Sequence, residues 1–154
     1  NAPIFATTYG TDTMIWAGGT GATIGLVLLM TFIAKSKYFK TLGRMSVGPG
    51  IFNINEPVIF GFTNCNEPIM IIPFVLVTQI NFILAYIVTS LGLIEKCVVQ
   101  IPWTTPPVIS AFLSTNGDIR AAVFHIILIV IGVMIYLPFL KMSEKSLNNQ
   151  IEEN

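Results

Sequence analysis

Residues 48–61 read GPGIFNINEPVIFG, an apolar stretch that glycine and proline interrupt repeatedly. The stretch contains one acid, Glu56, and two amides, Asn53 and Asn55. Long hydrophobic runs lie on both sides of it. An ionisable group at membrane depth costs about 2.5–3.5 kcal/mol on insertion scales. We therefore expect Glu56 to have a functional role.

The composition indicates an integral membrane protein. The 154 residues are 53% hydrophobic and only 10% charged, whereas about 25% of a soluble domain is charged. The formal net charge is zero, which gives no reason to expect a nucleic-acid partner. Cys65 and Cys97 lack the spacing of a metal site or a disulfide framework, and we expect no metal or cofactor. The chain starts at Asn1 without a charged leader, so we interpret it as a piece of a longer protein.

Three hydrophobic runs have the roughly 20 residues that a helix needs to cross a bilayer. They are residues 14–34, 69–94 and 121–140. The first run begins with small residues, and the spacing of Gly21 and Gly25 favours close packing of two helices. A phosphate-binding glycine loop would need a following Lys-Ser or Lys-Thr pair, which this run lacks.

Two shorter apolar segments, residues 48–66 and 97–117, are broken near their centres by proline or glycine. Non-helical backbone at membrane depth must be enclosed by protein or line a water-filled cavity. We therefore predict two re-entrant hairpins, and broken segments of this kind point to the binding site of a transporter. The predicted fold is an all-α integral membrane unit with about three transmembrane helices and two re-entrant hairpins, forming part of a larger transport domain over residues 1–154.

The basic residues predict the orientation. Six of the eight follow the first and third runs, and they are Lys35, Lys37, Lys40, Arg44, Lys141 and Lys145. By the positive-inside rule these ends are cytoplasmic. The hairpin 48–66 then enters from the cytoplasmic side and the hairpin 97–117 from the outer side. Residues 141–154 are predicted to form a mobile, polar cytoplasmic tail.

Glu56 is the strongest candidate for chemistry. Pro57 frees a backbone carbonyl group and restricts Glu56 to extended geometry. The carboxylate and the amides of Asn53 and Asn55 together accept and donate hydrogen bonds, which suits a ligand with many hydroxyl groups. The acid could also take a proton from a substrate hydroxyl. The alternative is a structural carboxylate bonded to neighbouring backbone.

A second constellation is Trp103 with Thr104 and Thr105, where an indole face can stack on a sugar ring and hydroxyls can bind its polar edge. The alternative for Trp103 is an interfacial tryptophan. Glu67 repeats the Asn-Glu-Pro triplet but is better explained as an acid in the first turn of the following helix.

His125 could serve as a proton relay or phosphoryl acceptor, but a histidine without a partner is more often a packing residue. We interpret Cys65 and Cys97 as packing residues too, since nothing electropositive surrounds them.

The run from Phe52 to Gly61 resembles the membrane-embedded IIC component of the bacterial phosphoenolpyruvate-dependent sugar phosphotransferase system, in its lactose/cellobiose/diacetylchitobiose branch. Residues 18–23, 35–37, 66–74 and 102–107 support the resemblance. It implies a permease of the bacterial cell membrane, dimeric at full length, that carries a β-linked disaccharide such as cellobiose and couples transport to phosphorylation by IIA and IIB partners. It assigns sugar binding and phosphoryl transfer to Glu56, and it places the aromatic of the second hairpin on Trp103.

The chain departs from the family pattern in four respects. The family's histidine-bearing upstream hairpin and its scaffold half lie outside these 154 residues, as does a phosphocysteine domain. Residues 62–68 are also more polar than the family pattern. Two other classes stay open: an ion-coupled secondary transporter with Glu56 as the proton or cation site, and a structural membrane anchor. The sequence leaves the identity of the sugar open.

Overall fold

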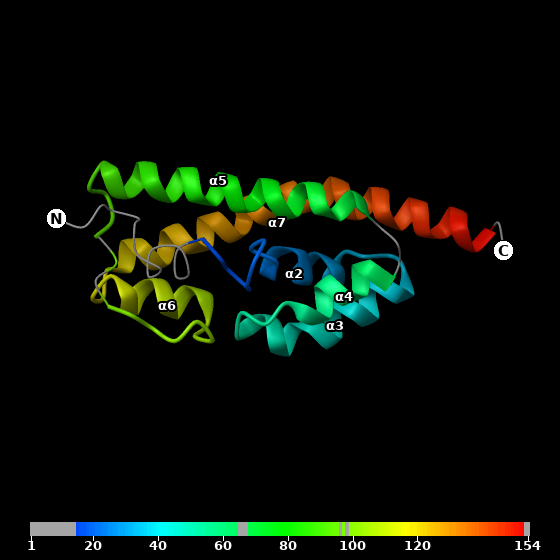
Figure 1. The fold of residues 1–154 in the computed structure, drawn as a ribbon, viewed down its shortest axis with the longest axis horizontal. Coiled ribbons are helices and arrows are strands. Elements are labelled where there is room, and N and C mark those ends of the chain that lie inside the picture. The colour runs from blue at the N-terminus through cyan, green and yellow to red at the C-terminus, as the bar shows by residue number, and fades with distance from the viewer. Residues whose placement is uncertain (1–14, 65–67, 96, 98, 153–154) are drawn as a thin grey trace.

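The computed structural model describes residues 15–64, 68–95, 97 and 99–152, and these residues form helices and connecting turns without a strand. The labels follow Figure 1. The helices are α2 (Ile24–Phe32), α3 (Lys37–Ile51), α4 (Glu56–Asn64), the 3-10 helix η1 (Pro68–Met70), α5 (Ile71–Ser90), α6 (Pro107–Ser114) and α7 (Ile119–Glu152). The predicted all-α class is confirmed for this part of the chain.

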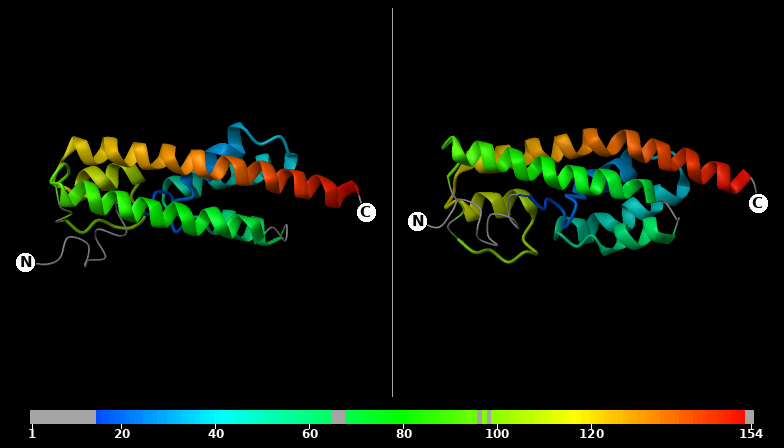
Figure 2. Two further views of the ribbon diagram at one scale, coloured as in Figure 1. Left: turned by 90° about the horizontal axis from the view of Figure 1, so that it is seen from above. Right: turned by 45° about the horizontal axis from the view of Figure 1, so that its top comes forward.

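Helices α5 and α7 run side by side as two long rods (Figures 1 and 2). Their 20 and 34 residues correspond to about 30 and 51 Å at 1.5 Å per residue. Both have the length and composition of a membrane span. Many of their apolar side chains face outward, as Ile83 and Met134 do at 53% and 69% exposure. Such exposed apolar surface is typical of helices that contact lipid rather than a soluble core.

The shorter helices form two groups along these rods. Helices α2, α3 and α4 lie together towards one end, and α6 lies towards the other (Figure 1). The main core lies between the first group and the long helices, and it includes the buried side chains of Leu29, Met30, Phe39, Val58 and Tyr136. Phe39 stacks on Phe62 with ring centroids 5.2 Å apart.

The single helix predicted for residues 14–34 is wrong within the described residues. Only Ile24–Phe32 is helical, and residues 15–23 form turns in which Gly18, Gly19 and Gly21 have φ between 84° and 90°. That conformation suits glycine and is incompatible with a right-handed helix. Two helices, not three, are therefore long enough to span a bilayer in the part of the chain that the structure describes. Gly25 does pack closely as predicted, because a Cβ there would lie 3.0 Å from the backbone nitrogen of Val133.

The long runs 69–94 and 121–140 are confirmed as helical, although their ends differ. Helix α5 stops at Ser90. Helix α7 continues to Glu152, so residues 141–152 are helical where the sequence predicted a polar tail. The segment consists largely of good helix formers, and it is anchored, since Leu140 and Ser143 are buried.

The predicted hairpin 48–66 is a helix–turn–helix unit with a longer first arm than expected, because α3 begins at Lys37 and α4 ends at Asn64. The predicted hairpin 97–117 has one helical arm only, α6, preceded by a non-helical segment over its described residues 97 and 99–106. The two units extend from opposite ends of the molecule towards its middle (Figure 1).

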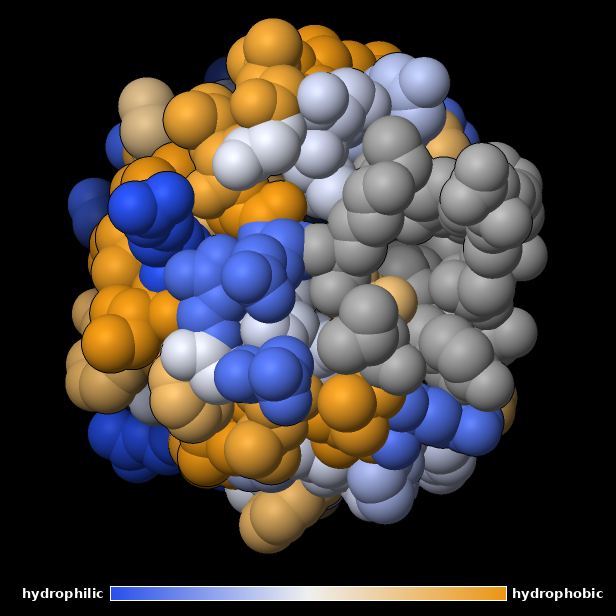
Figure 3. Space-filling view, turned by 90° about the vertical axis from the view of Figure 1, so that its left-hand side faces the viewer, coloured by the Kyte–Doolittle hydropathy of each residue, from blue (hydrophilic) through white to orange (hydrophobic). Residues whose placement is uncertain are grey.

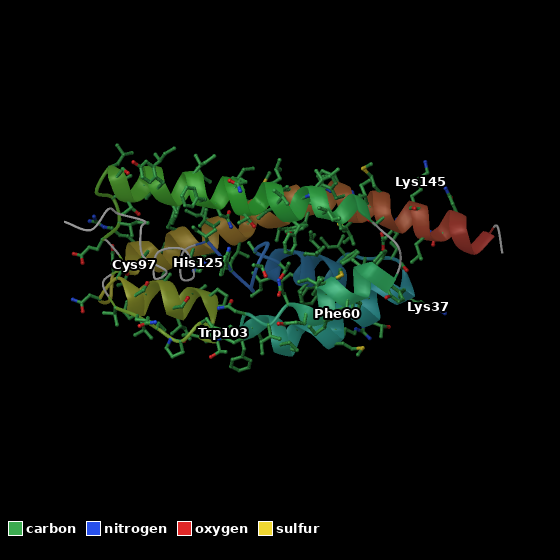
Figure 4. All side chains as sticks on the ribbon, viewed as in Figure 1. Lys37, Phe60, Cys97, Trp103, His125 and Lys145 are labelled. Atoms are coloured by element: carbon green, nitrogen blue, oxygen red, sulfur yellow. The ribbon has the colours of Figure 1, made fainter. Side chains whose placement is uncertain are left out.

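Charged residues lie at both ends of the molecule. Lys37 and Lys145 lie at the end where α3 begins (Figure 4), and Lys35, Lys141 and Lys145 line a common cavity there. Figure 3 views the opposite end, where hydrophilic side chains lie among hydrophobic ones. The exposed residues near that end include Glu95 and Arg120.

Candidate functional site

The tips of the two units touch through Asn53. This residue lies in the turn between α3 and α4, and its side-chain Nδ2 donates hydrogen bonds to the carbonyl oxygens of Trp103, at 2.7 Å, and Thr105, at 3.0 Å. Figure 4 shows Trp103 between α6 and this turn. Two segments about 50 positions apart in the sequence therefore form one structural site.

The turn-rich loop over residues 15–23 contacts the same site. The backbone N–H of Gly18 donates to Asn53 Oδ1 at 2.8 Å, and Asn55 Nδ2 donates to the carbonyl oxygen of Thr20. Gly19 is pressed against the turn, because a Cβ there would lie 2.7 Å from the carbonyl oxygen of Asn53. Only a residue without a side chain fits at this contact.

These three segments enclose a cavity of about 240 Å³. Its lining residues are Trp16, Gly19, Thr20, Asn53, Asn55, Glu56 and Trp103. The volume is a little below the roughly 300–1,000 Å³ of typical small-molecule pockets. The cavity is therefore suited to a small polar group or to one part of a larger ligand.

Glu56 is the one ionisable residue among those that line the cavity. It is exposed and is the first residue of α4, where the helix dipole favours a negative charge. A carboxylate accepts hydrogen bonds, the Thr20 hydroxyl both donates and accepts, and the two indole rings offer apolar faces. This mixture of groups matches a hydroxyl-rich ring compound better than a bare cation. Among the described residues, no cluster of three or more His, Cys, Asp or Glu side chains could hold a metal ion.

The structure brings four of the six predicted site residues together around the cavity: Asn53, Asn55, Glu56 and Trp103. Thr105 contributes its backbone carbonyl to Asn53, and Thr104 is partly buried beside it without lining the cavity. Sequence reasoning missed Trp16 and Thr20. Their signal was the glycine run Gly18–Gly21, which marks a turn as readily as a packed helix.

The other candidates lie elsewhere. His125 is buried on α7 at 1% exposure and does not line the cavity, in keeping with a packing residue. Cys97 Sγ lies 3.6 Å from Ser114 Oγ, at the end of α6. Cys65 and Glu67 fall outside the described residues.

Comparison with known proteins identifies the family. Residues 2–78, half of the chain, match the family described as "Phosphotransferase system, EIIC". The chain belongs to this family. The EIIC chain is 42% identical over 134 residues to the lichenan permease IIC component of Bacillus subtilis (strain 168), covering 85% of this chain and 30% of that protein. It is also 42% identical over 134 residues to the cellobiose-specific EIIC component of Lactococcus lactis subsp. lactis (strain IL1403), covering 87% of this chain and 27% of that protein.

A solved structure gives the same result for the fold. The crystal structure of the transporter ChbC, the IIC component from the N,N'-diacetylchitobiose-specific phosphotransferase system, superposes on this EIIC chain with a TM-score of 0.89 at 37% sequence identity. The superposition covers 95% of this chain and 34% of ChbC. The EIIC chain thus spans about a third of the length of the relatives that it matches.

Proposed function

We propose that the full-length protein is a sugar-specific permease of a phosphoenolpyruvate-dependent phosphotransferase system, and that it carries a β-linked disaccharide of the cellobiose type. The relatives support this substrate class, since their names specify cellobiose, lichenan and N,N'-diacetylchitobiose. The expected partners are the IIA and IIB components, with the full-length protein acting as a homodimer.

The observation that carries the proposal is the composition of the cavity between the two hairpin tips. Glu56, Asn55 and Thr20 supply the polar groups, and Trp16 and Trp103 supply aromatic faces. In our proposal Glu56 and the amide oxygen of Asn55 accept hydrogen bonds from sugar hydroxyls, and Trp103 stacks on a ring. Thr104 and Thr105 contribute to the rim beside Trp103.

Glu56 then serves as a general base in phosphoryl transfer. A sugar hydroxyl oxygen attacks the phosphorus of the phosphocysteine on IIB, an O–P bond forms and the P–S bond breaks. Glu56 takes the hydroxyl proton, and the cysteine leaves as thiolate. Its exposed position at the start of α4 leaves the carboxylate accessible to a ligand.

We further propose that α5 and α7 cross the bacterial cell membrane as part of a multi-pass protein, and that the α3–α4 unit and the segment ending in α6 are re-entrant hairpins. The cationic end with Lys35, Lys141 and Lys145 faces the cytoplasm by the positive-inside rule. The α3–α4 unit then enters from the cytoplasmic side, where the phosphoryl donor binds.

The test is uptake of radiolabelled cellobiose by cells that express the full-length protein with Glu56→Gln. The substitution keeps the side-chain size and removes the base, so we expect uptake with phosphorylation to fall at least 100-fold, within the range of general-base effects. Glu95→Gln is the matched control, because Glu95 is exposed and lies outside the cavity. Unchanged uptake of cellobiose and diacetylchitobiose by the Glu56→Gln protein would contradict the assigned role.

A further inference from the structure

We propose that Asn53 is a positioning residue, whose side chain fastens the tips of the two hairpin units and the 15–23 loop to one another and so sets the place of Trp103. The sequence alone suggests instead that Asn53 binds the sugar directly. The inference depends on the proposed function only for the identity of the ligand, since the contacts themselves lie within the protein.

The bonding capacity of the Asn53 side chain is the first support. A primary amide has two donor hydrogens on nitrogen and an acceptor oxygen. Both hydrogens are used, because Nδ2 donates to the carbonyl oxygens of Trp103 and Thr105. The oxygen accepts from the N–H of Gly18. Asn53 can therefore donate to a ligand only by releasing the loop that contains Trp103.

The backbone conformation of Asn53 is the second support. Its φ is +61°, in the left-handed region that glycine and asparagine adopt more readily than other residues. Glycine would allow the turn but would provide no side-chain amide. Aspartate would keep the acceptor for Gly18 but would turn a carboxylate towards two carbonyl oxygens. Asparagine is thus the residue that meets both the conformational and the hydrogen-bonding requirement.

The surroundings of Trp103 are the third support. Its side chain is 60% exposed, so packing of its own ring holds it only weakly. It lies in a non-helical segment, four residues before α6 begins at Pro107. The bond from Asn53 to the backbone carbonyl oxygen of Trp103 ties this segment to the rest of the cavity. Removing that bond should let the indole leave the position in which it lines the cavity.

The experiment uses the full-length protein in nanodiscs, labelled with 5-fluorotryptophan. The ¹⁹F signal of Trp103 is assigned by its loss in Trp103→Phe. Asn53→Asp removes both donors at constant size, and Asn53→Gly removes the side chain while permitting the backbone conformation. The controls are Asn116→Asp and Asn116→Gly, because Asn116 has a similar φ of 58° but is exposed and outside the cavity. Calorimetry with cellobiose measures affinity.

We expect both Asn53 variants to broaden or split the Trp103 signal without sugar present and to weaken cellobiose binding at least tenfold. Both Asn116 variants should keep the signal and bind within twofold of wild type. Weaker binding with an unchanged Trp103 signal would overturn the inference in favour of direct sugar contact. If neither the Trp103 signal nor the affinity for cellobiose changes, Asn53 has no role at this site, and the inference is also overturned. If Asn53→Asp does not fold, Asn53→Gly decides. If the wild type binds no disaccharide, the proposed function fails, while the sugar-free signal still decides the role of Asn53.

Discussion

Tyr136 donates its phenolic hydroxyl to the carbonyl oxygen of Gly21 at 2.6 Å, across 115 positions of sequence. Tyr136 is fully buried at 0% exposure on α7. Gly21 belongs to the turn-rich loop whose Trp16 and Thr20 line the cavity. The longest of the described helices therefore holds one wall of the candidate site through this bond.

Replacing Tyr136 with phenylalanine should destabilise the protein by about 1–3 kcal/mol, because the Gly21 carbonyl is left buried without its donor. Thermal melting of the full-length protein in detergent measures the effect. Tyr38→Phe is the comparison, since Tyr38 makes a similar bond to the carbonyl oxygen of Gly61 at 2.9 Å but is 39% exposed, where water can replace it. Equal melting temperatures for the two variants would contradict this explanation.

Gly19→Ala should abolish sugar binding or folding. The residue has a φ of +90°, and its new Cβ would lie 2.7 Å from the carbonyl oxygen of Asn53 and 2.8 Å from Asn55 Cγ. Gly48→Ala tests the same change in the interior of α3, where nothing lies within 4 Å. That variant should be neutral or more stable by about 0.5–1 kcal/mol, since alanine is the better helix former. Normal cellobiose binding by Gly19→Ala would show that the turn tolerates a side chain.

Glu144→Ala should loosen the start of α3. Its Oε1 accepts hydrogen bonds from the backbone N–H groups of Lys35, at 2.6 Å, and Ser36, at 2.8 Å. Ser36 precedes the first turn of α3, so the carboxylate acts as a helix cap supplied by α7. Losing a cap costs about 0.5–2 kcal/mol. Thermal melting should show that loss of stability for Glu144→Ala and a smaller loss for Glu144→Gln, because glutamine keeps an acceptor oxygen. Equal losses in the two variants would show that the charge matters instead of the cap.

Trp103→Ala should weaken cellobiose binding about tenfold, since an aromatic contact is worth about 0.5–1.5 kcal/mol beyond its buried area and 1.4 kcal/mol is a factor of ten. Trp103→Phe should lose less, because it keeps a ring. Phe52→Ala removes an exposed aromatic from the α3–α4 turn that does not line the cavity. Calorimetry of the three variants checks the prediction, and an equal loss in Phe52→Ala would argue against specific stacking.

The long helices could be predicted from the sequence because α5 and α7 are continuous apolar runs of sufficient length. The turns over residues 15–23 could not, because Gly18, Gly19 and Gly21 are compatible with both a packed membrane helix and left-handed turns. Contacts with residues distant in the sequence decide between the helix and the turns. The bond from Tyr136 and the close approach of Asn55 both hold the loop in its turns.

Four of the residues that line the cavity were predicted from the sequence, whereas Trp16 and Thr20 were not. Glu56, Asn55 and Trp103 stood out because polar and aromatic residues interrupt apolar segments. The link between the tips could not be predicted, because Asn53 binds backbone carbonyl groups. Every residue has such a group, so no sequence pattern reveals which one is bound. The helical end of α7 was missed for a similar reason, since Glu144 binds backbone N–H groups of a distant loop.

The use of backbone acceptors by Asn53 has a consequence for how such a site can evolve. Because the amide recognises the main chain at 103 and 105, the side chains at positions 103–105 can be exchanged without breaking the frame that presents them. In the proposed permease, the side chains at the rim can then change the sugar selectivity one residue at a time. The relatives of this chain are named for cellobiose, lactose and oligo-beta-mannosides. Bonds to the main chain that stay the same while the side chains at the rim are exchanged are a physical route to such diversity.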